Sequence, residues 1–430
     1  MKHILIDGYN LGLEKGTGVA TYARNLAREA GRIGHHISIL YGDRLPSARH
    51  PLLREIGFFD SKAHTRHSRL RDLAGIVSPR AARAAEIPIT GRVVTRQFTG
   101  RLPHHDILVN ARDVFSRASG RFDAWGTTTA VHLPRRPDVA HWTYPLPLRA
   151  PEAANLYTLH DLVPLRLPYT TLDNKRRYLA LIRTLARTAD HLVTVSECSR
   201  RDIIDITGIA PERVTNTYQS VDIPVRYRDV PEEQVAREVE GALGAAYKGY
   251  FLFWGSIEPK KNVGRIVEAY LASGVETPLV VVGARAWRAD GELRLLDAFA
   301  NGKPAAGDVR RGRIIQLPYA PFGLLVSLIR GAKGALFPSL YEGFGLPVLE
   351  AMLLGTPVLC SNTSSLPEVA GDAALSVDPY DGAAISAGIR ALDADAGLRA
   401  DLSSRGLAQA ALFSPDRYRA RLDALYQRFL

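Results

Sequence analysis

The sequence predicts an α/β protein made of two Rossmann-like domains. A strand-like apolar run, a glycine-bearing loop and a helical run follow one another near the N-terminus, and the same order returns twice in the second half. Units of this kind build parallel sheets covered by helices. The length of 430 residues suits two or three domains at roughly 150 residues each. We expect domains at 1–220 and 221–412 and a terminal helix at 413–430.

The first unit consists of a strand at 3–7, a loop from Gly8 to Gly18 and an amphipathic helix at 19–31. The loop after the first strand of such a sheet faces the ligand crevice. Gly16 and Gly18 are therefore candidates for ligand contact, and the alternative is that they are ordinary loop glycines. Further strands are expected at 37–41, 138–142, 155–159 and 191–195, and 45–105 is expected to be irregular.

The second unit places a strand at 250–254 before Gly255, Ser256 and Lys261, and a helix begins near residue 263. A lysine at the start of a helix is unfavourable to the helix dipole unless an anion neutralises it. Lys261 is thus predicted to bind a phosphate group, and the alternative is a surface lysine.

The third unit runs from a strand at 334–338 through a glycine loop to a helix at 347–354 and a strand at 356–360. Gly343 and Gly345 allow a close backbone approach, and the helix N-terminus favours an anion such as a diphosphate. Glu342 precedes the loop and Glu350 is placed in the first turn of the helix. We expect these two carboxylates to bracket a phosphate-sized hollow and to hold sugar hydroxyls.

His160 follows an apolar strand, at the sheet edge where doubly wound folds bind ligands. A histidine there can donate to a sugar hydroxyl or to charge developing in the reaction. The alternative is a turn cap formed with Asp161. At the other end of the chain, residues 414–416 cap a last helix whose apolar stripe includes Tyr418 and Tyr426.

The net charge of +11 allows nucleic acid, an anionic membrane surface or anionic substrates as partners. Nine lysines and arginines lie between Lys62 and Arg101, either as a solvated face or as a surface for lipid headgroups. No nucleic-acid-binding motif is found, so nucleic acid is the least favoured partner.

The sequence contains no run of about 18 apolar residues, and its start lacks the apolar core of a signal peptide. Cys198 and Cys360 have no metal-type spacing and are expected to be free thiols in a reducing compartment. We therefore expect a cytoplasmic protein, with possible contact at the inner face of the plasma membrane.

The segment from Glu342 to Glu350 resembles the E-x7-E signature of retaining GT-B-fold glycosyltransferases of family 4. Residues 337–339, 355–358, 159–164 and 255–262 are similar to that family too, so the resemblance covers nearly the whole chain. It implies two Rossmann-like domains facing across a cleft and a terminal helix that crosses back onto the first domain. Ser256 departs from the pattern, because many members carry an arginine there.

The resemblance implies roles for the candidate residues. Glu342 and His160 would contact the transferred sugar, Lys261 would neutralise the leaving diphosphate, Glu350 would bind the ribose, and Tyr319 would lie at the edge that holds the base. The expected catalytic residues are His160, Glu342 and Lys261, and the expected donor-binding residues are Gly16, Gly18, Gly255, Ser256, Lys261, Tyr319, Glu342, Gly343, Phe344, Gly345, Leu346 and Glu350.

The expected activity is the metal-independent, retaining transfer of a hexose to a glycan acceptor, lipid-linked and destined for a bacterial surface polysaccharide or exopolysaccharide. The segments at 160–164, 258–262 and 341–347 resemble enzymes that often use GDP-mannose, so mannose is favoured. No cofactor or metal is expected. The alternatives are a non-catalytic nucleotide-sugar-binding scaffold and a GT-B sugar-nucleotide epimerase; a phosphorylase is the least suitable, because its usual length is much greater.

Overall fold

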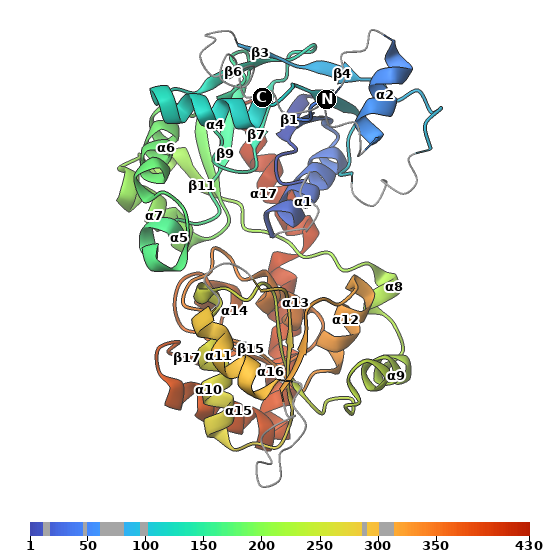
Figure 1. The fold of residues 1–430 in the computed structure, drawn as a ribbon, viewed down its shortest axis with the longest axis vertical. Coiled ribbons are helices and arrows are strands. Elements are labelled where there is room, and N and C mark those ends of the chain that lie inside the picture. The colour runs from blue at the N-terminus through green and yellow to red at the C-terminus, as the bar shows by residue number, and fades with distance from the viewer. Residues whose placement is uncertain (12–17, 46–49, 61–80, 95–101, 286–289, 301–313) are drawn as a thin grey trace.

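The computed structural model describes residues 1–11, 18–45, 50–60, 81–94, 102–285, 290–300 and 314–430. Two lobes lie one above the other in Figure 1, and each contains a parallel sheet with helices on its faces. The predicted α/β class is therefore confirmed. The residue limits that we predicted for the two domains and the terminal helix stay predictions.

The upper lobe is built on an eight-stranded sheet that is parallel except for its last strand. In spatial order its strands are β11 (Val214–Asn216), β10 (His191–Thr194), β9 (Ala154–Thr158), β7 (Val139–Trp142), β1 (His3–Asp7), β2 (His36–Tyr41), β5 (Ile107–Asn110) and β4 (Ala85–Ile87). A small sheet beside it contains β3 (Ala82–Arg83), β6 (Thr129–His132) and β8 (Leu148–Arg149).

The lower lobe is built on a six-stranded parallel sheet. In spatial order its strands are β14 (Ile314–Leu317), β13 (Leu279–Val282), β12 (Phe251–Trp254), β15 (Gly334–Phe337), β16 (Val358–Ser361) and β17 (Leu375–Val377). Most of these strands are fully buried apolar runs, as expected where helices cover both faces of a sheet.

The strand order of each sheet reverses at one point. In the upper sheet the chain leaves β1 toward β2 but continues from β7 toward β9, and in the lower sheet β12 and β15 stand in the same relation. Ligands of open α/β sheets bind beyond the carboxyl ends of strands at such a switch point. The topology alone thus directs attention to the segments that follow β1, β7, β12 and β15.

Helices cover the sheets of both lobes. In the upper lobe they are α1 (Gly18–Ile33), α2 (Pro51–Phe59), α4 (Val114–Trp125), α5 (Val163–Arg166), α6 (Lys175–Thr188) and α7 (Glu197–Thr207). The lower lobe has α8 (Val225–Arg228), α9 (Glu232–Leu243), α10 (Val263–Ser273), α11 (Asp290–Phe299), α12 (Phe322–Gly331), α13 (Leu346–Leu353), α14 (Leu366–Ala370), α15 (Gly382–Ala394) and α16 (Ala396–Ala410).

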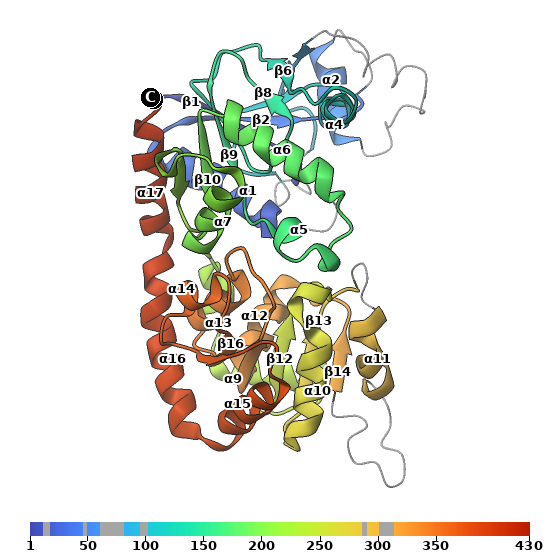
Figure 2. The ribbon, with the colours of Figure 1, turned by 90° about the vertical axis from the view of Figure 1, so that its left-hand side faces the viewer.

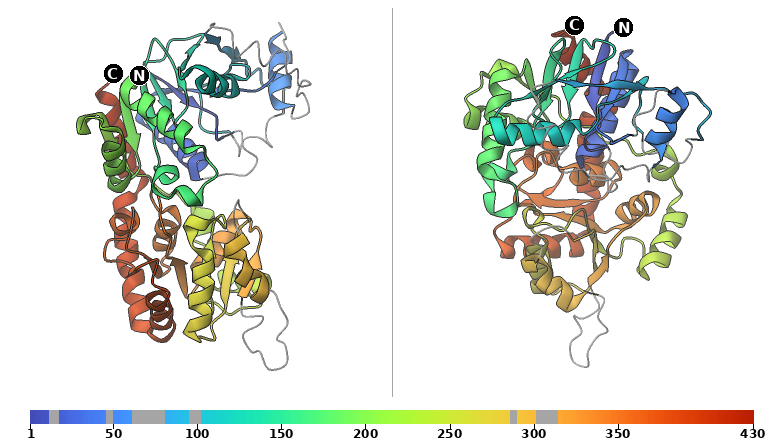
Figure 3. Two further views of the ribbon diagram at one scale, coloured as in Figure 1. Left: turned by 60° about the vertical axis from the view of Figure 1, so that its left-hand side comes forward. Right: turned by 45° about the horizontal axis from the view of Figure 1, so that its top comes forward.

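The last helix, α17 (Pro415–Gln427), crosses back to the upper lobe and packs on α1. Figure 2 shows α16 and α17 as one column along both lobes, and Figure 3 shows the two termini side by side. Ser414 caps α17 as the sequence predicts, and four residues of the predicted apolar stripe are buried: Tyr418, Leu422, Leu425 and Tyr426. The fifth, Phe429, lies beyond the end of the helix and is half-buried. The C-terminal crossover helix is therefore present.

Two expectations need correction. The region at 45–105 is less irregular than predicted, because α2, β3 and β4 lie within it. Glu350 is the fifth residue of α13, which begins at Leu346, so it lies in the second turn rather than the first. Most of the Arg-rich segment 62–101 lies outside the described residues, as does Gly16.

Candidate active site

The loop between β15 and α13 touches the upper lobe. A Cβ atom added to Gly343 would lie 2.8 Å from the backbone oxygen of His160 and 3.0 Å from Asp161 Oδ2. Gly345 has a φ of +110°, which only glycine adopts readily. Glycine at these positions thus allows the loop to turn and to reach the upper lobe.

Neighbouring hydroxyls hold this loop in shape. Ser365 donates through its hydroxyl to the carbonyl oxygens of Glu342 at 2.9 Å and Phe344 at 2.8 Å. The backbone N–H of Glu342 donates to Ser364 Oγ at 3.0 Å. Gly345 is the N-cap residue of α13 and provides no side-chain cap. The helix N-terminus therefore faces the loop with its favourable dipole end available to an anion.

Lys261 and Glu342 form a close ion pair beside this loop. Lys261 Nζ lies 2.6 Å from Glu342 Oε1, and the two side chains are only 12% and 9% exposed. Burial alone would raise the pKa of Glu342, but the charges of Lys261 and Lys260 outweigh it, so the pKa lies below its ordinary value. Glu342 is thus an ionised hydrogen-bond acceptor at neutral pH.

The segment after β12 is tied to the segment after β15. Asn262, which has a φ of +62°, donates through Nδ2 to the carbonyl oxygens of Pro338 and Pro379, each at 2.8 Å. The N–H of Leu340 donates to the carbonyl oxygen of Lys260 at 2.8 Å. These bonds fix the backbone that carries Lys261 relative to Glu342.

Glu350 lines a cavity of about 110 Å³ between the lobes, together with residues that include Asn25, Asp222 and Phe322. Trp254 donates through its indole N–H to Glu350 Oε2 at 2.9 Å. Burial raises the pKa of Glu350 to about 7. This carboxyl therefore changes its charge near neutral pH.

His160 faces these groups from the upper lobe. It lies two residues beyond β9, and its Nε2 is 2.9 Å from the carbonyl oxygen of Thr143, which follows β7. Burial lowers the pKa of His160, so the ring is neutral at pH 7. The structure thus places Gly343, which follows Glu342, against the backbone oxygen of His160, and Glu342 is paired with Lys261. The catalytic roles of these residues stay predictions.

Other predicted residues lie around this centre. Gly18 begins α1, where an added Cβ would lie 3.8 Å from Leu346 Cδ1 in the other lobe. Gly255 has a φ of +131° directly after β12, and the Ser256 hydroxyl donates to Glu258 Oε1 at 3.1 Å. Tyr319 is 78% exposed, next to the edge strand β14.

Phe344 does not point to the candidate donor site. Its ring is 3% exposed and packs against Tyr218 and Phe413, with centroid distances of 6.4 and 5.6 Å. These two residues belong to the two chain segments that connect the lobes. Only the backbone of Phe344 is therefore available to a donor, and its side chain packs at the hinge.

Several contacts between the lobes have no signal in the sequence. The N–H groups of Glu197 and Cys198 at the start of α7 donate to the carboxylate of Glu368 at 2.9 and 3.0 Å. Tyr341 hydrogen-bonds to Asp202 of the same helix. These partners lie more than 130 residues apart in the chain, so local patterns carry no information about them.

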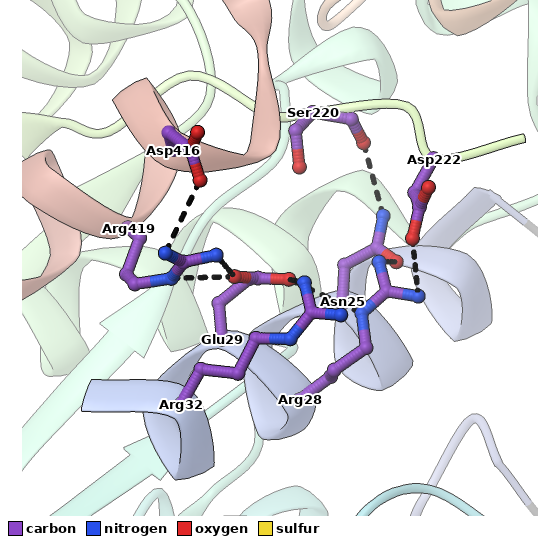
Figure 4. A network of polar contacts seen from close by, with 8 residues as sticks. All are labelled: Asn25, Arg28, Glu29, Arg32, Ser220, Asp222, Asp416 and Arg419. Carbon is purple, nitrogen blue, oxygen red and sulfur yellow. Dashed lines mark hydrogen bonds and ion pairs between the residues drawn. The ribbon is translucent and has the colours of Figure 1, made fainter. Parts of the chain in front are cut away.

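A polar network joins α1 to the linker and to α17 (Figure 4). Glu29 is fully buried and accepts from Arg32 at 2.9 Å, from Arg28 at 3.1 Å and from Arg419 of α17 at 2.9 Å. Arg28 also pairs with Asp222 of the linker at 2.9 Å. Asn25 donates to the carbonyl oxygen of Ser220 at 2.9 Å. The network thus anchors the hinge on one helix.

Comparisons with known proteins agree with this architecture. The family model "Glycosyltransferase Family 4" matches residues 16–223, and "Glycosyl transferases group 1" matches residues 243–409. The chain belongs to the group 1, family 4 glycosyltransferases. The two matches correspond to the two lobes and leave the linker between them.

Two curated relatives are named as mannosyltransferases. The chain is 36% identical over 262 residues to O-antigen chain mannosyltransferase B of Escherichia coli, covering 60% of this chain and 66% of that protein. It is 26% identical over 442 residues to the MMP alpha-(1->4)-mannosyltransferase of Mycolicibacterium hassiacum, covering 96% and 94%. The first match thus spans just under two thirds of the relative's length.

Solved structures share the fold at low identity. Sucrose-phosphate synthase from Thermosynechococcus elongatus superposes with a TM-score of 0.66 at 15% identity, covering 100% of this chain and 99% of that one. Anabaena HepE with UDP-glucose gives a TM-score of 0.65 at 14% identity and covers all of both chains. The predicted GT-B fold is confirmed.

Proposed function

We propose that this glycosyltransferase moves a hexose, with mannose favoured, from a nucleotide diphosphate-sugar to a glycan acceptor with retention of anomeric configuration. One observation carries the proposal. Glu342, which is paired with Lys261, directly precedes Gly343, and Gly343 lies against the backbone oxygen of His160. His160 is itself bonded to the segment after the switch-point strand β7. Donor and acceptor sites of a transferase have to meet at such a point.

The lower lobe supplies the groups that a departing diphosphate needs. Lys261 provides a positive charge, and α13 provides a helix N-terminus that begins in the glycine loop. Within the described residues, no group of three or more histidine, cysteine, aspartate or glutamate side chains is arranged to hold a metal ion. We propose that Lys261 and the α13 N-terminus stabilise the leaving group without a metal.

The upper lobe supplies the acceptor site in this proposal. The acceptor hydroxyl attacks the anomeric carbon from the face that the diphosphate leaves. The bond from that carbon to the phosphate oxygen breaks, the bond to the acceptor oxygen forms, and the phosphate oxygen takes the acceptor proton. Closure of the lobes around both substrates excludes water, which would otherwise hydrolyse the donor.

Mannose is favoured because both relatives described above are named as mannosyltransferases. The O-antigen relative also supports a growing polysaccharide as acceptor, and we propose a lipid-linked one. No helix among the described residues is long and apolar enough to cross a membrane. The net charge of +11 suits attachment to anionic lipid. Binding to anionic liposomes at low salt tests this part, and a protein that ignores them contradicts it.

The deciding experiment offers GDP-mannose, UDP-glucose, UDP-galactose and UDP-N-acetylglucosamine to the protein in the presence of EDTA. We expect GDP-mannose to raise the melting temperature and to release GDP slowly. Stabilisation by a different nucleotide-sugar would change the proposed donor sugar but leave the proposed transferase activity in place. Binding without turnover would favour a non-catalytic scaffold, and conversion of the donor to its epimer without acceptor would favour an epimerase.

A further inference from the structure

A chain of buried polar side chains runs through the upper lobe beneath His160. The hydroxyl of Tyr22 on α1 lies 2.9 Å from Thr158 Oγ1, and His141 Nε2 lies 2.9 Å from the same oxygen. His141 Nδ1 lies 2.9 Å from the hydroxyl of Tyr426 on α17. These four side chains are at most 1% exposed. The proposed reaction uses none of them directly.

These four hydrogen-bonded side chains carry no net charge. Burial lowers the pKa of His141 to about 3, so its ring is neutral, and burial raises the pKa of Tyr22 to about 12. A neutral imidazole donates through one nitrogen and accepts through the other, so both its neighbours can be satisfied. A fully satisfied buried network fixes side-chain positions. This network is therefore suited to positioning and not to proton supply.

His160 is held between the end of this chain and the backbone. The rings of Tyr22 and His160 meet edge to face, with centroids 4.8 Å apart and planes at 89°. His160 Nε2 lies 2.9 Å from the carbonyl oxygen of Thr143. The N–H of Thr143 in turn donates to the buried carboxylate of Asp7. The ring thus has one supporting contact from α1 and one from the segment after β7.

The contact with Thr143 decides the tautomer of His160. A carbonyl oxygen can only accept, so Nε2 must carry the proton. In the neutral ring, Nδ1 then holds a lone pair. A sugar hydroxyl that reaches His160 at Nδ1 has to donate its proton to this lone pair. This differs from the donor role that the sequence suggested for the residue.

We propose that Tyr22, anchored through Thr158 and His141 to Tyr426, is a positioning residue that holds His160 so that Nδ1 accepts a hydrogen bond from the transferred sugar. The inference rests on the proposed function for the sugar contact. It also means that the orientation of the His160 ring depends on the packing of α17 against the upper lobe. Because α17 follows the lower lobe in the chain, the hinge and the sugar contact share one support.

The first test needs no substrate. Nitrogen-15 NMR of histidine-labelled protein, with His160 assigned by loss of its signals in His160→Asn, should show a neutral ring protonated at Nε2. We expect Tyr22→Leu and Tyr426→Phe to shift these signals or mix the tautomers. Tyr157→Phe is the matched control, because it also removes a buried tyrosine hydroxyl, which donates to the carbonyl oxygen of Leu148. This variant should leave the His160 signals unchanged. A proton on Nδ1 in the wild type overturns the inference.

The second test is a double-mutant cycle on turnover with the preferred donor. We expect Tyr22→Phe to lower kcat on the order of 10-fold and Tyr22→Leu on the order of 100-fold, because small misplacements of a positioned group are costly. The donor KM should change less than twofold. In a His160→Ala background neither change should lower kcat further, because Tyr22 acts through His160.

Equal losses in both backgrounds would overturn the positioning role of Tyr22. Where Tyr22→Leu does not fold, Tyr426→Phe provides a second variant for the same measurements. If Tyr426→Phe leaves both the His160 signals and kcat unchanged, the link to α17 is overturned. The NMR result does not depend on catalysis. A protein that turns over no nucleotide-sugar but shows the Nε2-protonated, Tyr22-dependent ring would therefore contradict the proposed function and leave the positioning geometry supported.

Discussion

At the scale of single residues, the candidate site consists of charges that are already paired before a donor arrives. Lys261 is matched by Glu342 at 2.6 Å, with both side chains largely buried. A diphosphate would compete for Lys261, and Glu342 would then be released toward sugar hydroxyls. The pair therefore holds both groups in position in the site.

His160→Ala and Glu342→Ala should each lower kcat by at least ~100-fold, the usual value for a positioned catalytic group. Glu342→Gln is the variant to use where loss of the partner of Lys261 destabilises the protein. Steady-state kinetics at saturating donor measures kcat, and circular dichroism checks the fold. A folded variant of either residue with full activity would remove that residue from the catalytic set.

The pH dependence of donor binding should report on Glu350. Burial raises its pKa to about 7, so the carboxyl is protonated below and ionised above that pH. The family resemblance implies that Glu350 binds the donor ribose. In that role an ionised carboxylate accepts hydrogen bonds from the ribose hydroxyls, so donor KM should fall about 10-fold between pH 6 and pH 8. Glu350→Gln should raise KM and flatten this profile. A profile that Glu350→Gln does not alter would contradict the assignment.

The same shift has a consequence for stability. The folded protein holds the Glu350 proton more tightly than the unfolded chain does, where the ordinary value is 4.5. The contribution of Glu350 to the free energy of unfolding is therefore most favourable below pH 4.5 and is lost as the pH rises to about 7. A bound donor would compensate for the ionised carboxylate.

At the scale of elements, the strand–loop–helix units around the candidate site are predicted well from the sequence. The strands, glycine loops and helices around Gly255 and Gly343 are found as predicted, because apolar runs and glycines are local signals. The helix α4 and the strand β5 were not predicted. The residue before α4, Asp113, is of a type that often caps helices, but here it has a φ of +53° and its side chain makes no cap hydrogen bond.

Sequence patterns identify the polar residues of the candidate site but not the residues that hold their side chains in place. Trp254 supports Glu350 and Tyr22 supports His160, and both are apolar-looking positions in a strand and a helix. Their partners lie 96 and 138 positions away in the chain. Only the packed fold brings such pairs together, so periodicity could not reveal them.

The docking of α17 on α1 should depend on Glu29. Glu29→Gln removes the charge that Arg28, Arg32 and Arg419 share in the buried network (Figure 4), and we expect a loss of about 3 kcal/mol in the free energy of unfolding. Asp416→Asn is the control, because it removes an ion pair to the same Arg419 but is 85% exposed. It should cost no more than about 0.5 kcal/mol.

Urea denaturation measures both free energies, and hydrogen exchange shows where the loss arises. We expect amides of α17 in Glu29→Gln to exchange faster than those of the lower sheet. Equal stability of Glu29→Gln and the wild type would show that the three arginines do not need this carboxylate, and α17 would then be held by its apolar stripe alone.

At the scale of the whole molecule, two lobes are joined by two covalent segments and by noncovalent contacts, among them those of Gly343 with His160 and of Glu368 with the start of α7. The linker near Ser220 and the segment before α17 connect them, and Phe344 packs its ring against residues of both. The loop that carries Glu342 therefore has two contacts: Phe344 packs against the connecting segments, and Gly343 lies against the backbone oxygen of His160. Any closing motion of the lobes has to move this loop.

Gly343→Ala should separate donor binding from turnover. The added methyl group would lie 2.8 Å from the carbonyl oxygen of His160, closer than real contacts allow, so the lobes cannot meet fully. The backbone at Gly343 needs no left-handed conformation, so the lower lobe itself is not strained. We expect kcat to fall on the order of 100-fold, while the affinity for the nucleotide diphosphate, measured by calorimetry, changes little.

Gly382→Ala provides the matched control, because it lies in the same lobe and an added Cβ meets nothing within 4 Å. Small-angle scattering with and without the preferred donor should show compaction in the wild type and in Gly382→Ala, and less of it in Gly343→Ala. Normal compaction together with normal kcat in Gly343→Ala would mean that the contact at His160 is not required for turnover. Normal kcat together with reduced compaction would mean that the chemistry proceeds with the lobes apart, and the proposed exclusion of water by closure would have to be abandoned.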